Sequence, residues 1–225
     1  RLGDFLASRG QPGDAEAALT HYQQSLRLSQ QLLEANPSFA LAARDASVSL
    51  ERLGDFLASR GQPGDAEAAL THYQQSLRLS QQLLEANPSF ALAARDASVS
   101  LERLGDFLAS RGQPGDAEAA LAHYQQGLNI RQQLREANPN SAQAARDVSV
   151  SLNNLADFLA SRGQPGDAEA ALAHYQQGLN IRQQLREANP NSAQAARDVS
   201  VSLNNLADFL ASRGQPGDAE AALAH

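Results

Sequence analysis

The chain repeats itself with a fixed period of 51 residues, and this period restricts the folds open to it. One nineteen-residue segment, RLGDFLASRGQPGDAEAAL or its close variant NLADFLASRGQPGDAEAAL, begins at Arg1, Arg52, Arg103, Asn154 and Asn205. A single globular core could not satisfy the same sequence in several different surroundings. A linear stack gives each copy nearly the same neighbours.

The copies fall into two pairs. Residues 1–51 and 52–102 are identical, whereas residues 103–153 and 154–204 differ from each other only at Arg103/Asn154 and Gly105/Ala156. We therefore expect one array over residues 1–225, with copies at 1–51, 52–102, 103–153 and 154–204 and a partial copy at 205–225.

Each copy contains two helical patterns. Apolar residues recur at steps of four and three from Phe90 to Leu108, which predicts one stripe on a helix and fits no strand. Asn87 is the expected N-cap of this helix, Gly112 its expected end, and Asp116 the expected cap of a second helix. Short loops between the helices require antiparallel packing. The sequence thus predicts an all-α stack of antiparallel helical hairpins.

Composition excludes several classes of protein. The 18 basic and 25 acidic side chains give a net charge of −7, which argues against a nucleic-acid binder with a basic face. There is no cysteine, so disulfides and thiolate metal sites are impossible. We expect a cytoplasmic protein, seen here as a fragment, because neither a signal peptide nor a membrane-spanning segment is visible.

The residues also argue against catalysis. The sequence contains no glycine-rich phosphate loop, serine elbow or histidine–carboxylate grouping. The histidines recur once per period without a second ligand beside them, at His21, His72, His123, His174 and His225. We expect no enzyme activity, no cofactor and no metal site.

The pattern of small and large residues resembles the tetratricopeptide repeat (TPR) family. The residues that carry the resemblance are Leu155, Ala156, Leu159, Gly163, Ala171, Tyr175 and Gly178. The segment Ser151–Ala156 is similar to the kinesin-light-chain variety found in bacterial arrays. The family's repeat has about 34 residues, so this repeat is an enlarged one. The resemblance implies a right-handed α-solenoid whose first helices line a concave groove.

The same resemblance implies which residues face that groove. They follow the leucines that stand where the family often has tryptophan, together with one residue a turn later. These residues are Glu51, Arg52 and Asp55; Glu102, Arg103 and Asp106; Asn153, Asn154 and Asp157; and Asn204, Asn205 and Asp208.

The chemistry of these positions suggests the kind of partner. An asparagine amide can donate and accept, which suits it to holding a peptide backbone. Chaperone-binding members of the family clamp a terminal carboxylate with asparagine and lysine, but this chain has an aspartate at one such position and no lysine. We expect a non-catalytic scaffold for protein–protein interaction that binds a neutral or basic peptide.

Three other interpretations remain open. The charged residues after the leucines fit a solvated face with ion pairs within and between copies. The array could be a structural spacer that self-associates end to end, because no polar capping repeat is visible. It could also be a sensor module of a larger bacterial signalling or defence protein.

Overall fold

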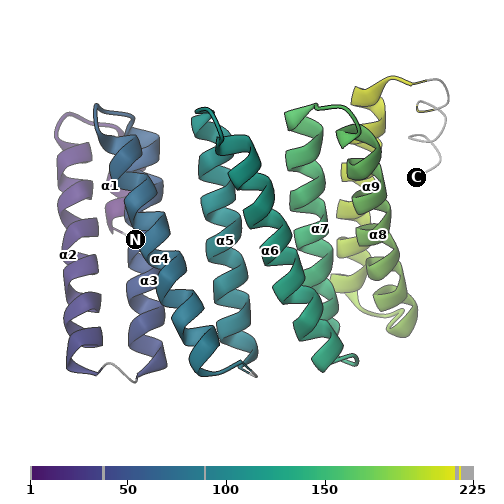
Figure 1. Ribbon diagram of the computed structural model, residues 1–225, viewed down its shortest axis with the longest axis horizontal. Helices are drawn as coiled ribbons and strands as arrows, with labels where there is room; N and C mark the ends of the chain where they lie inside the picture. The colour runs from purple at the N-terminus through teal and green to yellow at the C-terminus, as the bar shows by residue number, and fades with distance from the viewer. Residues whose placement is uncertain (1, 37–38, 89, 216–217, 219–225) are drawn as a thin grey trace. The chain divides into compact units, whose positions relative to one another are not determined.

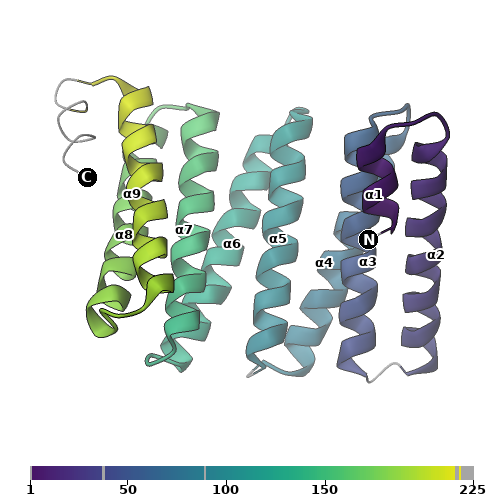
Figure 2. The ribbon, with the colours of Figure 1, turned by 180° about the vertical axis from the view of Figure 1, so that it is seen from behind.

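The computed structural model describes residues 2–36, 39–88, 90–215 and 218. Its described helices, shown in Figures 1 and 2, are α1 (Leu2–Arg9), α2 (Asp14–Ala35), α3 (Ala40–Arg60), α4 (Asp65–Ala86), α5 (Ala91–Arg111), α6 (Asp116–Ala137), α7 (Ala142–Arg162), α8 (Asp167–Ala188) and α9 (Ala193–Arg213). The described ranges contain no strand, which confirms the all-α class. The end of the final partial copy, residues 216–217 and 219–225 with His225, lies outside the described residues.

The chain forms two compact units, which we call unit 1 (Arg1–Asp116) and unit 2 (Ala117–His225). In unit 1, α1 packs on α2, α2 on α3, α3 on α4 and α4 on α5, and α3 also contacts α5. In unit 2, α7 packs on α8 and α8 packs on α9, and α7 also contacts α9. Consecutive helices joined by short turns lie side by side, as the hairpin prediction requires. The right-handed sense and the single array remain predictions.

The turn inside each hairpin follows from its glycines. Gly61 ends α3 with φ 62°, and Gly64 precedes α4 with φ 84°, both in the left-handed region that glycine tolerates best. Gly112 ends α5 as expected, and its N–H donates to the Leu108 carbonyl at 3.1 Å.

The expected helix starts were partly wrong. Asn87 is not the N-cap of α5: its N–H donates to the Leu83 and Leu84 carbonyls, so it closes α4 instead. Phe90 stands at the N-cap, three residues later. Asp116 is the first residue of α6, and its carboxylate accepts from the backbone N–H of Gln113 in the preceding turn.

An arginine–aspartate clamp closes every hairpin turn that is described. In one example, Arg60 donates from Nε and Nη2 to the Asp65 carboxylate at 2.8 and 2.6 Å, and the Gln62 N–H adds a third hydrogen bond at 2.9 Å. The Arg60 hydrogen bonds hold the pKa of Asp65 below its ordinary value of 3.8. The clamps are Arg9–Asp14, Arg60–Asp65, Arg111–Asp116, Arg162–Asp167 and Arg213–Asp218.

The cores are built from leucine, alanine and paired aromatic rings. Leu50 and Leu101, which replace the family's tryptophan, are fully buried. Tyr73 packs on Phe107 with ring centroids 5.1 Å apart. A Cβ added at Gly54 would lie 3.2 Å from the Tyr73 ring, so the small residue lets this ring approach the α3 backbone.

Candidate functional site

Seven of the twelve expected groove residues line two hollows between successive first helices, one in each unit, whereas Glu102, Asp106, Asn153, Asn154 and Asn204 line neither. The unit 1 groove, of about 280 Å³, lies between α3 and α5 and is lined by Arg44, Ser47, Val48, Glu51, Arg52, Asp55, Asp96, Val99, Ser100 and Arg103. The unit 2 groove, of about 380 Å³, lies between α7 and α9 and is lined by Asp157, Ala160, Ser161, Tyr175, Asn205, Asp208, Phe209 and Ser212.

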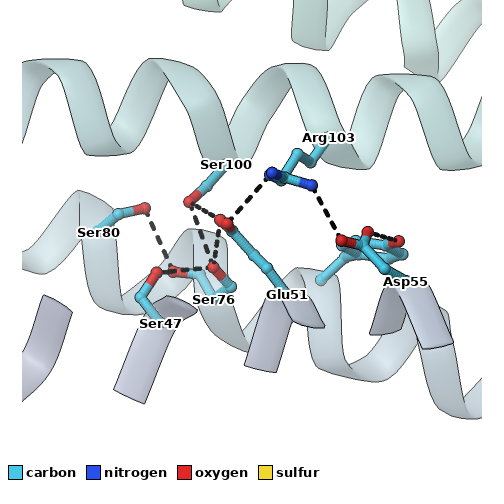
Figure 3. A network of polar contacts seen from close by, with 8 residues as sticks. Ser47, Glu51, Asp55, Ser76, Ser80, Ser100 and Arg103 are labelled. Carbon is cyan, nitrogen blue, oxygen red and sulfur yellow. Dashed lines mark hydrogen bonds and ion pairs between the residues drawn. The ribbon is translucent and has the colours of Figure 1, made fainter. Parts of the chain in front are cut away.

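In unit 1, Glu51 is the centre of a buried polar network (Figure 3). Only 7% of this residue is exposed. Its Oε1 accepts from the hydroxyls of Ser76 at 2.9 Å and Ser100 at 2.7 Å. Its Oε2 forms an ion pair with Nε of Arg103 at 3.2 Å. Because Ser76 comes from α4 and Ser100 from α5, the carboxylate joins three helices.

Arg103 spans the unit 1 groove from α5 to α3 (Figure 3). Besides Glu51, its guanidinium donates from Nη1 to Oδ2 of Asp55 at 3.0 Å. The other oxygen of Asp55 accepts from the Tyr73 hydroxyl at 2.6 Å. Burial, and then this hydrogen bond, raise the pKa of Tyr73. One oxygen of the Asp55 carboxylate therefore binds a tyrosine and the other binds an arginine.

The remaining charges of the unit 1 groove are also paired. Arg44 lies 2.9 Å from a carboxylate oxygen of Asp96, and Arg52 lies 3.5 Å from Asp4. The groove thus contains three arginines against three carboxylates. This outcome matches the ion-pair interpretation of these positions.

The unit 2 groove lies further along the helices than the unit 1 groove, and the two share only the equivalent positions Asp55/Asp157 and Arg103/Asn205. Asp157, Asp208 and the Asn205 amide line it, and arginine is absent from the lining residues that the structure describes. The Tyr175 hydroxyl donates to Oδ1 of Asp157. Desolvation raises the pKa of Asp157, and the tyrosine hydrogen bond opposes that shift. The Tyr175 and Phe209 rings, with centroids 5.2 Å apart, are buried residues that border the groove.

Asn153 stands where Glu51 stands, two periods further along the chain. Only 4% of it is exposed, and its Oδ1 has no hydrogen-bond partner among the described residues. A Cβ added at Gly178 would lie 2.6 Å from this oxygen. The amide therefore occupies space that glycine leaves open, where unit 1 has Ser76.

The twelve expected site residues differ in exposure. The buried ones are Glu51, Glu102 and Asn153; the half-buried ones are Asn154 and Asn205; the exposed ones are Arg52, Asp55, Arg103, Asp106, Asp157, Asn204 and Asp208. The expectation that all twelve face an open groove needs correction for these three, which are buried. For Glu51 and Asn153 the physical reason is packing against the second helix, at Ser76 and Gly178 respectively.

Sequence reasoning missed the partners of these residues, although a signal existed. Glu51, Ser76 and Arg103 are exchanged together for Asn153, Gly178 and Asn205 after two periods. The signal is a weak one, because one period on Glu102 is retained while Gly127 and Asn154 already replace the serine and the arginine. In the described part of the chain, no group of three or more metal-ligating side chains could hold an ion. Of the described helices, none combines the length and apolar character needed to cross a membrane.

Comparison with known proteins supports the family resemblance. The tetratricopeptide-repeat family model matches residues 149–177 and 200–225. Protein NCA1 of Arabidopsis thaliana is 29% identical over 138 residues, which make up 61% of this chain and 32% of that protein. The chain therefore spans about a third of the length of this relative.

Two solved structures of helical repeats were also compared with the chain. The crystal structure of the de novo designed helical repeat protein DHR64 has a TM-score of 0.36 at 12% identity, covering 88% of this chain and 96% of that one. The DHF79 filament has a TM-score of 0.33 at 14% identity, covering 85% and 99%. The fold assignment rests on the helices of this chain and not on these two structures.

Proposed function

We propose that this chain of tetratricopeptide-like hairpins is a non-catalytic protein-interaction module that binds a neutral or basic segment of a partner along its first helices. Tetratricopeptide repeats generally mediate contacts between proteins, and the family match lies in the copies that form unit 2. The unit 2 groove is the surface that we assign to the partner.

One observation carries this proposal: the unit 2 groove is acidic and its lining supplies no cation. Asp157 and Asp208 lie in it with the Asn205 amide, whereas Asp55, the unit 1 counterpart of Asp157, is paired with Arg103. Complementary charge on a partner would be steered to this surface and would offset the cost of placing two carboxylates together. An acidic segment would meet repulsion there.

Fluorescence anisotropy with labelled short peptides tests the proposal. The peptides are built from glycine and serine and carry several arginines, several glutamates or no charge. We expect the basic peptide to bind most tightly, to weaken as salt rises, and the acidic peptide to bind least. Tighter binding of the acidic peptide would contradict the proposal.

A matched pair of variants locates the site. Asp157→Asn combined with Asp208→Asn should weaken binding of the basic peptide about tenfold, since two attractive charges are lost near the ligand. The control, Glu136→Gln combined with Glu187→Gln, removes the same charge from exposed positions outside the groove. Equal weakening by both variants would show that net charge, and not this groove, attracts the peptide.

A further inference from the structure

The two units offer an internal comparison of one groove with and without a guanidinium. In unit 1, Arg103 places its guanidinium between Glu51 and Asp55, at 3.2 and 3.0 Å. Two periods later the equivalent residue is Asn205, whose side chain is shorter and uncharged. The unit 2 groove therefore lacks the cation that this backbone arrangement holds in unit 1.

One of the two carboxylates that bind Arg103 is retained in unit 2, since Asp55 becomes Asp157 whereas Glu51 becomes Asn153. Asp55 accepts from Tyr73 through Oδ1 and from Arg103 through Oδ2. Asp157 accepts from Tyr175 through the same oxygen, Oδ1. Its Oδ2 thus corresponds to the atom that binds the guanidinium in unit 1.

The rest of the groove also suits an arginine side chain. Asp208 provides a second carboxylate, and the Asn205 side-chain oxygen provides a neutral acceptor. The Tyr175 and Phe209 rings border the groove but are only 4% and 7% exposed, so the acceptor oxygens and not the rings supply its contacts. A guanidinium can donate to several acceptors in one plane, whereas an ammonium acts as a compact point charge.

We propose that the unit 2 groove binds an arginine side chain of the partner protein, whose guanidinium takes the place that Arg103 fills in unit 1. This inference rests on the proposed function, because it names the group through which a basic segment is recognised. It also gives Asn205 a definite role: its shortness leaves the space for the incoming side chain.

NMR titration with single amino-acid probes tests this inference directly. The probes are N-acetyl-arginine amide, N-acetyl-lysine amide and the uncharged isostere N-acetyl-citrulline amide. We expect chemical-shift changes at Asp157, Asn205 and Asp208, with affinity for the arginine probe about fivefold above that for the lysine probe and with no saturable binding of citrulline. Equal affinity for arginine and lysine, or shift changes elsewhere in the chain, would overturn the inference.

A refilling variant gives the sharpest control. Asn205→Arg supplies the guanidinium from the chain itself, as Arg103 does in unit 1, so the arginine probe should no longer bind. Gln183→Arg adds the same charge at an exposed position of α8 outside the groove and should retain binding. Should Asn205→Arg disturb folding, as judged by circular dichroism, Asp157→Asn replaces it and should reduce probe binding about tenfold. Undiminished binding to the folded variant would overturn the inference.

Longer peptides separate failure of this inference from failure of the proposed function. Arginine-rich and lysine-rich peptides of equal charge are titrated against the wild-type chain and the variant carrying both Asp157→Asn and Asp208→Asn. Equal binding of both peptides, weakened by the variant, would leave the proposed function standing and overturn the arginine inference. Binding of neither peptide would overturn both.

Discussion

Units 1 and 2 share one backbone plan but treat charge differently. In unit 1 the buried Glu51 joins Ser76, Ser100 and Arg103, and the groove neutralises itself. In unit 2 the equivalent Asn153 leaves its oxygen without a hydrogen-bond partner among the described residues, and no arginine is among the described residues that line the groove with Asp157 and Asp208. The Arg44–Asp96 ion pair of unit 1 is retained in unit 2 as Arg146–Asp198. A few exchanged side chains on one repeated frame thus remove from unit 2 the arginine that pairs with Glu51 and Asp55 in unit 1.

The two units also differ where the first helices begin. In unit 1, Phe39 and Phe90 occupy the N-cap positions of α3 and α5, and neither supplies a side-chain cap. In unit 2, the hydroxyls of Ser141 and Ser192 accept from the third residue beyond them, at 3.1 Å in each case. The later copies therefore have, in place of an exposed phenylalanine ring, a serine whose hydroxyl accepts a hydrogen bond from a backbone N–H of the first helical turn.

The largest loss of stability should come from removing an arginine–aspartate clamp, which both units have. The comparison tests whether the clamp contributes equally to the two units. Asp65→Ala in unit 1 and Asp167→Ala in unit 2 each remove a carboxylate that accepts from an arginine and a backbone N–H. We expect each to lower the free energy of unfolding by about 2 kcal/mol, measured by urea denaturation. If only one of the two variants lost stability, the two turns would not be equivalent.

The pH dependence of stability provides a check on this clamp. The pKa values of Asp65 and Asp167 are both held below 3.8 by their arginine partners. Above pH 3.8 both carboxylates therefore contribute their full stabilisation to the folded chain. As the pH falls below this value, the unfolded chain binds protons more readily than the folded chain, and the stabilisation is lost. The two alanine variants should lose less stability than the wild type across this acidic range.

An intermediate effect is expected from Gly178→Ala, which tests the packing difference between the units. The new Cβ would meet the Asn153 oxygen at 2.6 Å. Crowding should cost about 2 kcal/mol, offset by about 1 kcal/mol of improved helix propensity, which leaves a net loss. Measured in a double-mutant cycle, Asn153→Ala should relieve this loss. Additive effects of the two substitutions would show that these residues do not interact.

The smallest effect should come from the helix caps. Ser141→Ala and Ser192→Ala should each cost about 1 kcal/mol or less, because one backbone N–H loses its acceptor. Hydrogen exchange should show the change at Ala144 and Ala195, whose N–H groups are capped. Phe90→Ser is the converse change in unit 1, and unchanged protection at the start of α5 would contradict a capping role for this position.

Much of the fold could be predicted because it depends on local patterns. The apolar steps from Phe90 to Leu108 predict a helix, and Gly112 with the Gln-Pro-Gly turn predicts where it ends. The start of α5 could not be placed in the same way. Asn87 suits a helix N-cap by residue type, yet its backbone closes α4, and only the path of the connecting segment decides between the two.

The site was less predictable, since adjacent positions on a helix differ in what they face. Leu50, Glu51 and Arg52 follow one another, and a charged residue is normally expected in solvent. Burial of Glu51 depends on hydroxyls contributed by α4 and α5, which a pattern within one helix cannot show. Arg52 and Arg103 are exposed as expected, but the structure pairs them with carboxylates of neighbouring helices.

The arginine–aspartate clamp has a consequence for how such a gene can change in length. Arg60 and Asp65 are five residues apart and belong to the same period, as do their counterparts in the other described turns. Unequal crossing-over between copies inserts or deletes whole multiples of 51 residues and so leaves each turn with both of its partners. Copy number can therefore drift while every hairpin that remains still closes on itself.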